Sequence, residues 1–377
     1  MTSATPQRFV FLDVLRALAV LWMIQVHITN VILAPSLKTD WIYNLLNISN
    51  GFVAPAFIFC AGIGLYIALT RKAEDYLQFK QPLRDYLRRL SFILFWAYML
   101  HIPVFAFSKF PTLTLLELQS WLQFDVLQTI VFASLTVLLV FFIARDVHNT
   151  ALISGVTACG VFFGTVFMWQ HINASHLPVW ITYALSNNSP SGFPYLPWSG
   201  YLMAGVFFSD MFFRASNKQL LARYLVGVGL VLPVLIFMWK GAQVHTPWSD
   251  LWWSSSPGMH AFRICGLLVG FGGLFLIENF LRSSKVGTTL QILGMESLFL
   301  YLSHLQIVYG EFTPRLLAWL GIHDGNYATV AVAWLVITIP LVYAAIVWHR
   351  FKKTKPVAAR WILTAQIVCT LLLFMIL

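Results

Sequence analysis

Three ionisable side chains, Asp13, Arg16 and His27, lie within the first long apolar stretch of the chain, residues 9–33. Ionisable groups are costly in hydrocarbon, so their presence there needs a reason. At about 100° per residue they share one face of a helix, and the helical rise separates Arg16 from His27 by roughly 16 Å. Histidine can accept and donate protons near pH 7. The spacing therefore predicts a polar seam that runs from one end of this helix well into its other half.

A simpler interpretation of the same residues is structural. Asp13 and Arg16 are three residues apart and can pair at the membrane surface, with Arg16 extending its charge toward the headgroups. A lone histidine can be satisfied by a neighbouring helix. Three polar residues on one stripe of an otherwise apolar helix nevertheless favour a functional role.

A second group of candidate residues lies in the apolar run 290–309. Tyr301 and His304 fall on one face of the predicted helix. Counted from the predicted inner ends of their helices, His304 and His27 are each about 14 to 15 residues along, which is roughly 21 to 22 Å into a core of about 30 Å. We therefore expect these two histidines at similar depth, and His101 near the same depth.

Four other residues toward the predicted outer ends are candidates for binding: Gln128, Trp198, Tyr201 and Arg263. Arg263 lies only a turn or so inside its helix end, where it either reaches the membrane surface or presents positive charge to an outer site. An aromatic belt accounts for Trp198 and Tyr201 equally well. Gln128 follows Asp125, which is alternatively a helix N-cap at the membrane boundary.

The composition identifies the class of protein. Of the 377 residues 59% are hydrophobic and 10% are charged, with a mean hydropathy of +0.76, whereas about a quarter of a soluble domain is charged. The chain is predicted to be an all-α polytopic membrane protein with about eleven transmembrane helices in a single domain, 1–377. The predicted spans are 12–33, 51–70, 89–107, 124–144, 151–170, 198–213, 222–239, 259–280, 290–309, 327–348 and 359–377.

Lys and Arg are concentrated in alternate connections, which predicts a cytoplasmic N-terminus and a C-terminus on the outer side. The predicted outer connections hold only Lys38, Lys109, Lys240 and Arg315 of the 24 basic residues. Basic inner loops that face anionic lipid account for the net charge of +10, so no nucleic-acid partner is expected. The four cysteines have no metal-like spacing, and no metal is predicted.

Five stretches together resemble a known family. They are LDVLRALAVLWMIQVH, GFVAPAFIFCAGIGL, DVLQTI, FPYLPWSGYLMAG and LGMESLFLYLSHLQIVY. Over nearly its whole length the chain is similar to membrane-bound acyltransferases, most closely to the heparan-alpha-glucosaminide N-acetyltransferase catalytic domain and its bacterial relatives. Its start also resembles the wider acyltransferase-3 superfamily, which has Asp, Arg and His at the spacing of Asp13, Arg16 and His27.

The resemblance implies acetyl-CoA as the acyl donor on the cytoplasmic side. It implies an amine or hydroxyl of a sugar-type acceptor, a glycan or glycolipid, across the membrane. The chain would then be an O- or N-acetyltransferase of the bacterial inner (plasma) membrane, as a monomer or a homo-oligomer. The family's histidine between the first two helices has no counterpart here between Ile28 and Pro55, which makes His27 the histidine that we favour.

Acyl transfer needs a base or a nucleophile, together with donors that stabilise the oxyanion. We expect His27 to be that base or nucleophile, and His304 and Tyr301 to assist it or to bind the acceptor. Arg16 would contact the phosphate-bearing part of acetyl-CoA, and Asp13 would hold Arg16 in place.

Two other classes of function remain open at this point. A transporter or flippase could conduct protons or a polar solute along the same seam, although the sequence has no inverted repeat of the kind that many transporters show. A structural membrane partner without chemistry of its own predicts that Asp13, Arg16 and His27 can each be replaced without loss of function.

Overall fold

The computed structural model describes residues 8–171, 176–187, 189–242, 252–253, 255–310, 312–319 and 324–377. These ranges are helical apart from their loops, and within them an isolated bridge joins Leu33 to Gly325. The all-α class predicted from the sequence is confirmed. Helices satisfy their backbone hydrogen bonds internally, which is why long apolar runs adopt this form in lipid.

Eight helices in the described ranges are long and apolar enough to cross a membrane. They are α1 (Val10–Ile32), α2 with α3 (Trp41–Asn50 and Val53–Leu77), α6 (Val126–Ala144), α7 (Val147–His171), α10 (Lys218–Gly241), α11 (Pro257–Leu276), α16 (Tyr327–Thr354) and α17 (Pro356–Ile376). A ninth candidate consists of α13 (Lys285–Met295) and α14 (Ser297–Tyr309), bent by 74° at the break between them. Many large apolar side chains on these helices are exposed, as a bilayer allows. The chain is a multi-pass integral membrane protein.

Each apolar run predicted from the sequence overlaps a helix or a helix pair. Two of them, α4 (Gln81–Met99) and α9 (Tyr195–Arg214), are 19 and 20 residues long but are not apolar enough to count among the eight. This accounts for the difference from about eleven predicted spans. The shorter helices are η1 (Pro35–Thr39), η2 (Phe107–Thr112), α5 (Leu115–Ser120), α8 (Val179–Leu185), α12 (Glu278–Ser283) and α15 (Phe312–Trp319).

Two helix boundaries correct the prediction. The sequence predicts one helix over 89–107 that carries His101, but α4 ends at Met99 and His101 lies in the turn after it. Pro103 explains this end, because proline lacks an N–H and disfavours helical geometry in the residue before it. The run 290–309 is likewise not one helix, since it breaks at Glu296, where φ is −100° and ψ is 19°.

The chain folds as two compact units. Unit 1 comprises Met1–Ala56 and Leu267–Trp361, and unit 2 comprises Phe57–Gly266 and Ile362–Leu377. The interpretation of 1–377 as a single acyltransferase domain stays a prediction.

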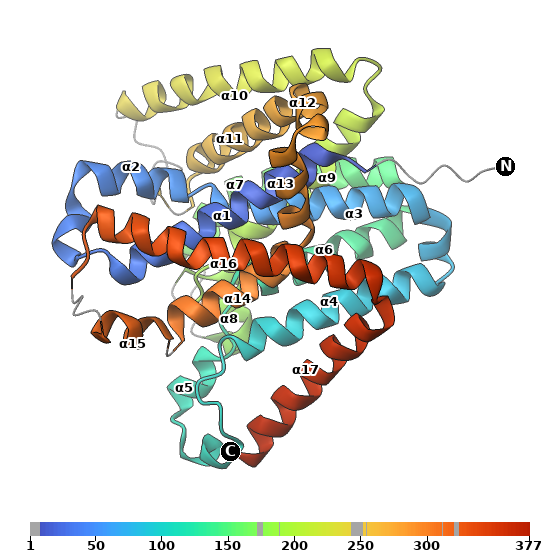
Figure 1. Cartoon of the computed structure of the whole chain (residues 1–377). Coiled ribbons are helices and arrows are strands. Elements are labelled where there is room, and N and C mark those ends of the chain that lie inside the picture. The colour runs from blue at the N-terminus through green and yellow to red at the C-terminus, as the bar shows by residue number, and fades with distance from the viewer. Residues whose placement is uncertain are drawn as a thin grey trace. The chain divides into compact units, whose positions relative to one another are not determined.

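In unit 1, α1 packs against α12, α13, α14 and α16. α1 and α16 are antiparallel, because Gly325, just before α16, donates its backbone N–H to the carbonyl of Ile32 at the end of α1, at 3.0 Å. Figure 1 shows the two helices side by side. α13 approaches α1 closely at Gly294, where an added β-carbon would lie 1.8 Å from the carbonyl oxygen of Asp13.

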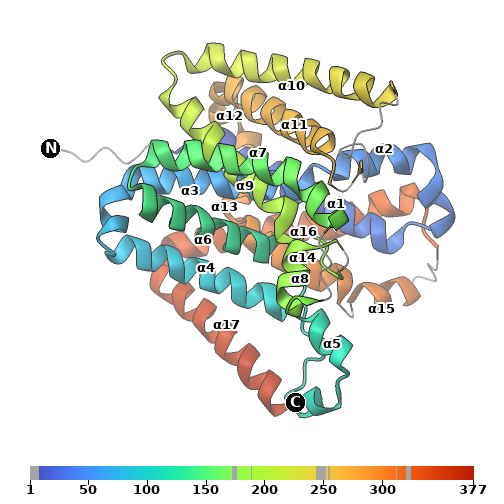
Figure 2. The ribbon, with the colours of Figure 1, turned by 180° about the vertical axis from the view of Figure 1, so that it is seen from behind.

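In unit 2, α7 and α9 pack along each other and α6 lies against both (Figure 2). α9 also approaches the helix that begins unit 2. A β-carbon on Gly62 would lie 2.0 Å from the carbonyl oxygen of Leu202, and one on Gly205 would lie 2.3 Å from that of Phe59. Small residues at such contacts let membrane helices pack backbone to backbone.

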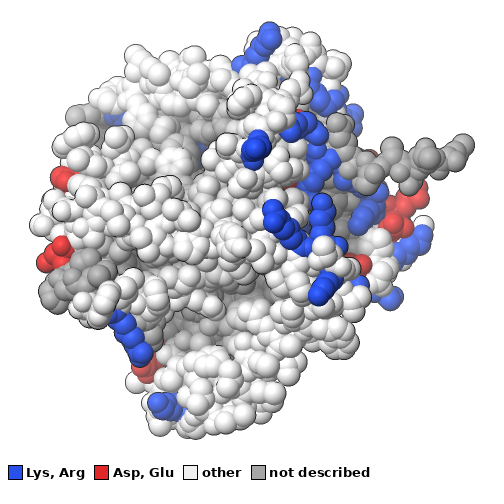
Figure 3. Space-filling model, in the orientation of Figure 1, with Lys and Arg blue, Asp and Glu red and all other residues white. Residues whose placement is uncertain are grey.

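Basic side chains are grouped rather than scattered, and Figure 3 shows groups of Lys and Arg beside broad areas without charge. In unit 1 the group comes from the beginning of α1, from α12 and α13, and from the end of α16: Arg8, Arg282, Lys285, Arg350, Lys352 and Lys353. Such grouping is typical of the cytoplasmic side of a membrane protein. The orientation itself stays a prediction.

Candidate functional site

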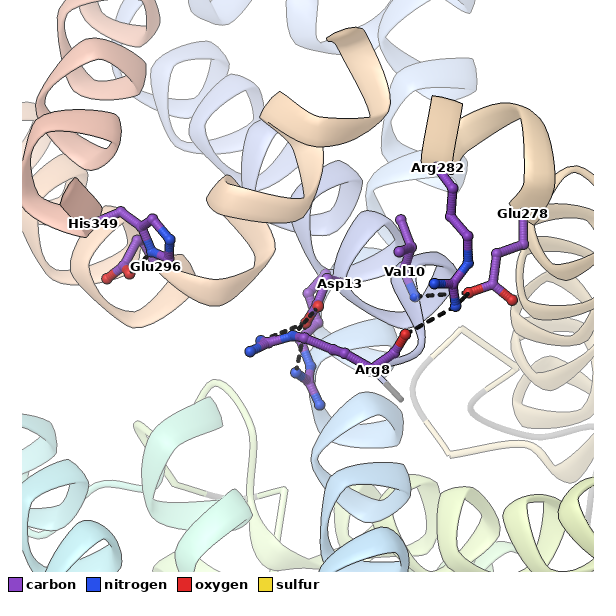
Figure 4. Close-up of polar contacts among 8 residues, drawn as sticks. Arg8, Val10, Asp13, Glu278, Arg282, Glu296 and His349 are labelled. Carbon is purple, nitrogen blue, oxygen red and sulfur yellow. Dashed lines mark hydrogen bonds and ion pairs between the residues drawn. The ribbon is translucent and has the colours of Figure 1, made fainter. Parts of the chain in front are cut away.

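Asp13 is the centre of an ion-pair cluster at the beginning of α1 in unit 1. Its buried carboxylate accepts hydrogen bonds from Arg8 Nε at 2.6 Å and Arg8 Nη2 at 3.1 Å, and Arg16 Nη1 lies 3.5 Å from Oδ1. The Arg8 and Arg16 side chains remain 54% and 25% exposed. Asp13 therefore holds two cations that both keep surface for a further anion (Figure 4).

Glu278 extends this cluster around the N-terminus of α1. Its Oε1 accepts a hydrogen bond from the backbone N–H of Val10 at 2.8 Å and one from Arg282 Nη2 at 2.8 Å. Arg282 also donates to the backbone carbonyl of Arg8 at 2.9 Å. The first N–H groups of a helix have no partner within it, so Glu278 stabilises the start of α1 and fixes Arg8 beside Asp13 (Figure 4).

Glu296 lies at the bend between α13 and α14. Its side chain is buried, with His349 Nδ1 2.9 Å from Oε1 and Lys352 Nζ 2.6 Å from Oε2. Both partners belong to the last turns of α16, and Figure 4 shows His349 beside Glu296. The ion pairs thus tie the bend to α16 and set the direction in which α14 continues.

His27, His304 and Tyr309 meet at the opposite end of α1, also within unit 1. His27 Nδ1 lies 2.7 Å from the hydroxyl oxygen of Tyr309, and the His27 and His304 ring centroids are 5.3 Å apart. Sequence reasoning expected His27 and His304 at similar depth, and the structure brings their rings together. It missed Tyr309, which ends α14 and lies five residues after His304, away from the face chosen from the sequence.

His304 is fully buried, and its hydrogen bond defines its tautomer. His304 Nδ1 lies 2.8 Å from the carbonyl oxygen of Leu300, which can only accept, so Nδ1 carries the proton. His304 Nε2 has no partner among the described residues. Tyr301 packs its buried ring perpendicular to that of His304, with centroids 5.8 Å apart. Tyr301 and His304 therefore lie together, as their spacing predicts.

The two polar clusters of α1 are separate. Between Arg16 and His27 the same helical face carries Val20, Met23 and Ile24, all buried and apolar. The predicted seam thus consists of a charged cluster at one end and a histidine–tyrosine cluster at the other.

Gln128, a predicted binding residue in unit 2, is engaged in backbone contacts. It is fully buried, Nε2 donates to the carbonyl of Ala97 at 3.1 Å, and Oε1 accepts from the backbone N–H of Asp125 at 3.2 Å. Asp125 caps α6, which is the alternative that the sequence left open. His101 lies beside this cap, with Nε2 3.3 Å from Asp125 Oδ2.

Trp198, Tyr201 and Arg263 also lie together in unit 2, around a residue that sequence reasoning missed. The Arg263 guanidinium lies over the Trp198 ring, 5.4 Å from its centroid. The Tyr201 hydroxyl lies 2.6 Å from Nδ1 of His260, which precedes Arg263 by three residues on α11. The i, i+3 spacing of His260 and Arg263 was the available signal in the sequence.

A second histidine–carboxylate pair of unit 2 joins α7 to α9. His148 Nδ1 lies 2.7 Å from Oδ2 of the buried Asp210, and the Tyr66 hydroxyl donates to Oδ1 at 3.1 Å. In the part of the chain that the structure describes, no group of three or more His, Cys, Asp or Glu residues could hold a metal ion.

Taken together, the polytopic helical fold and the cluster of His27, His304 and Tyr309 define an integral membrane protein that carries side chains of the kind acyl-transfer enzymes use. Comparison with known families shows that residues 8–238 match the family described as heparan-alpha-glucosaminide N-acetyltransferase, catalytic. The match covers more than half of the 377 residues, and the chain belongs to this family. Neither the curated proteins nor the solved structures that were compared gave a match.

Membership makes this chain a membrane acetyltransferase. The matched residues include Asp13, Arg16 and His27. They end before Arg263, Tyr301 and His304, so the family match says nothing of these three positions.

Proposed function

We propose that this protein transfers an acetyl group from cytoplasmic acetyl-CoA to an amine or hydroxyl of a sugar-type acceptor, a glycan or glycolipid, at the outer side of a bacterial inner membrane. The observation that carries the proposal is the contact of His27 with Tyr309 and His304 in a chain of this acetyltransferase family. A transporter would need a continuous polar path along α1, whereas the buried apolar Val20, Met23 and Ile24 separate the two polar clusters.

The role of His27 follows from its hydrogen bond. With His27 Nδ1–H donating to the Tyr309 oxygen, Nε2 carries the lone pair that a general base or a nucleophile needs. In direct transfer, Nε2 takes the proton of the acceptor N–H or O–H while the acceptor atom attacks the thioester carbonyl carbon. The C–S bond then breaks, and the CoA thiolate leaves and takes that proton. Transfer through an acetyl-histidine at the same Nε2 gives the same products.

The neighbours of His27 have supporting roles in this proposal. The fully buried His304 and Tyr301 assist His27 or bind the acceptor. An N–H or O–H donor near the reacting carbonyl stabilises the oxyanion that forms on it. The hydroxyl of Tyr301 is such a donor.

The donor is assigned to the charged cluster at the other end of α1. Arg16 contacts the phosphate-bearing part of acetyl-CoA, and Arg8 supplies a second cation. Support comes from their exposed guanidinium surface and from Asp13, which holds both groups beside each other. The acceptor is assigned to Trp198, Tyr201 and Arg263 of unit 2, and Gln128 has a smaller part because its amide already makes two backbone contacts.

The proposal is tested with purified protein in liposomes supplied with acetyl-CoA and glucosamine, with release of the CoA thiol as the signal. We expect thiol release that depends on the protein and rises with glucosamine. Hydroxylamine, which cleaves acetyl esters and leaves acetyl amides, distinguishes transfer to oxygen from transfer to nitrogen. Absence of thiol release, together with absence of any melting-temperature shift with acetyl-CoA, would contradict the proposal.

A further inference from the structure

Most of the buried side-chain nitrogen and oxygen atoms that lack a hydrogen-bond partner in the described residues belong to two stretches of unit 2, which the contacts of Arg263 with Trp198 and of His260 with Tyr201 bring together. They lie at the beginning of α9 and at or just before the beginning of α11. They are Ser199 Oγ, Trp252 Nε1, Ser255 Oγ, Ser256 Oγ, His260 Nε2, and Nε and Nη1 of Arg263. Native proteins leave few such atoms, because a buried polar atom without a partner destabilises the fold. A concentration of them indicates a place built to contact a polar group from outside the chain.

Arg263 is the charged member of this cluster. It is 8% exposed, its Nη2 donates to the backbone carbonyl of Trp253 at 3.2 Å, and its guanidinium lies over the Trp198 ring. Among the described residues no carboxylate pairs with it, whereas the buried Asp13 and Glu296 of unit 1 both have cationic partners. A buried charge without a counter-ion is strongly unfavourable, so a bound anion would stabilise Arg263.

His260 adds a second unpaired nitrogen, Nε2, to the cluster that contains Arg263. It is fully buried, with its ring stacked on Phe162 at 4.8 Å and its Nδ1 2.6 Å from the Tyr201 hydroxyl. If that hydroxyl donates to Nδ1, Nε2 carries a proton and is a donor. Arg263 Nε and Nη1, His260 Nε2 and the serine hydroxyls then offer donors, which is the composition of an oxyanion site.

We propose that this cluster binds an oxyanion of the acceptor, and that the oxyanion is a carboxylate. The acceptor part of this statement rests on the proposed function, whereas anion binding at Arg263 does not. The planar guanidinium matches a planar carboxylate, and the burial of the unpaired atoms favours a small oxyanion over a sulfate or phosphate ester. His260 and Arg263 lie beyond the residues that match the family, so the assignment does not rest on the family match.

Glucuronate and glucose test the proposal because they differ only in the carboxylate at one carbon. Melting temperatures of the full-length protein in detergent are measured with each sugar, with glucose 6-phosphate and with glucose 6-sulfate, at constant ionic strength. We expect glucuronate to raise the melting temperature and glucose to leave it unchanged. Equal shifts with both would overturn the proposal. Larger shifts with the phosphate or sulfate ester would overturn the carboxylate assignment.

Arg263→Gln is expected to weaken the apparent affinity for glucuronate by about tenfold or more. Arg315→Gln makes the same change at an exposed residue and should leave the affinity unchanged. If Arg263→Gln does not fold, Ser256→Ala gives the same readout. Full affinity for glucuronate in every variant that folds contradicts the proposal. Asp250 lies outside the described residues. If Asp250→Asn and Arg263→Gln lower the melting temperature non-additively, the chain itself balances the charge and the proposal is wrong.

Failure of this inference is distinguishable from failure of the proposed function. Glucosamine has no carboxylate, so thiol release from acetyl-CoA with glucosamine tests the proposed function without the carboxylate site. If the protein acetylates glucosamine but its melting temperature does not respond to glucuronate, the proposed acetyltransferase function stands and the proposed carboxylate site is wrong.

Discussion

The imidazole Nδ1 of His27 lies 2.7 Å from the hydroxyl oxygen of Tyr309, although 282 positions separate them in the sequence. The contact joins the end of α1 to the end of α14 within unit 1. It orients the one histidine of α1 and leaves its Nε2 as the nitrogen for chemistry when Nδ1 carries the proton. Tyr309 is thus a positioning residue for His27.

Replacing Tyr309 by Phe should lower kcat by up to about tenfold, because a neutral hydrogen bond contributes roughly 0.5–1.5 kcal/mol. The ring remains, and at 54% exposure its hydroxyl adds little to folding, so the melting temperature should hardly change. The pH profile of kcat should shift, since the tautomer of His27 is no longer fixed. Tyr343→Phe, at a 70% exposed position of α16, is the matched control, and equal behaviour of the two variants would refute the role of Tyr309.

Asp13→Asn should destabilise the protein by roughly 1–3 kcal/mol, because it weakens charged hydrogen bonds from Arg8 to a buried carboxylate. Asp85→Asn is the control, since Asp85 and Arg88 form a surface pair with 56% and 76% exposed side chains, and should change stability by no more than about 0.5 kcal/mol. Thermal unfolding in detergent measures both. Equal melting temperatures for the two variants would contradict a structural role for Asp13.

Gly294→Ala should destabilise the protein by about 3 kcal/mol or more, or prevent accumulation of folded protein, because the new β-carbon would meet the backbone of Asp13. A backbone carbonyl cannot swing aside as a side chain can. Gly273→Ala is the control on α11, where an added β-carbon has nothing within 4 Å, and stability there should stay unchanged or rise by up to about 1 kcal/mol. Folded yield and thermal unfolding compare the pair. A wild-type melting temperature for Gly294→Ala would contradict the backbone contact between Gly294 of α13 and Asp13 of α1.

Asp40 should make stability depend on pH in the acidic range. The Tyr327 hydroxyl and the Tyr43 backbone N–H donate to its carboxylate, and these bonds lower the pKa of Asp40 below its ordinary 3.8. A depressed folded-state pKa gives stability that is present above the unfolded-state pKa and is lost as pH falls through the folded-state value. Asp40→Asn, which keeps a cap oxygen, should therefore melt below wild type at neutral pH, with the difference closing below about pH 4. A difference that stays constant from pH 7 to pH 3 would exclude this linkage.

The fold could largely be predicted because hydrophobicity alone specifies spanning helices in a bilayer. The errors have local causes. The turn at His101 follows from Pro103, whose effect within an apolar run is easily overlooked, and the break at Glu296 has no sequence mark except a charge in an apolar run. The ion pairs of Glu296 with His349 and Lys352 explain why a carboxylate is tolerated there.

The site could be predicted only in part. Asp13, Arg16 and His27 stand out because charge is rare in a spanning helix, and His304 shares that rarity. Tyr309 does not stand out, because aromatic residues are ordinary in such helices, and His260 does not, because it lies at the very beginning of the predicted span 259–280. Their importance arises from tertiary contacts across many residues, which helical periodicity cannot provide.

The most direct test of the account is the rate of CoA thiol release by His27→Asn in liposomes, beside His171→Asn at an exposed residue of α7 as control. The account predicts a loss of roughly 100-fold or more in kcat for His27→Asn alone, with the melting-temperature shift by acetyl-CoA retained. Acetyl transfer at the wild-type rate by His27→Asn would contradict it.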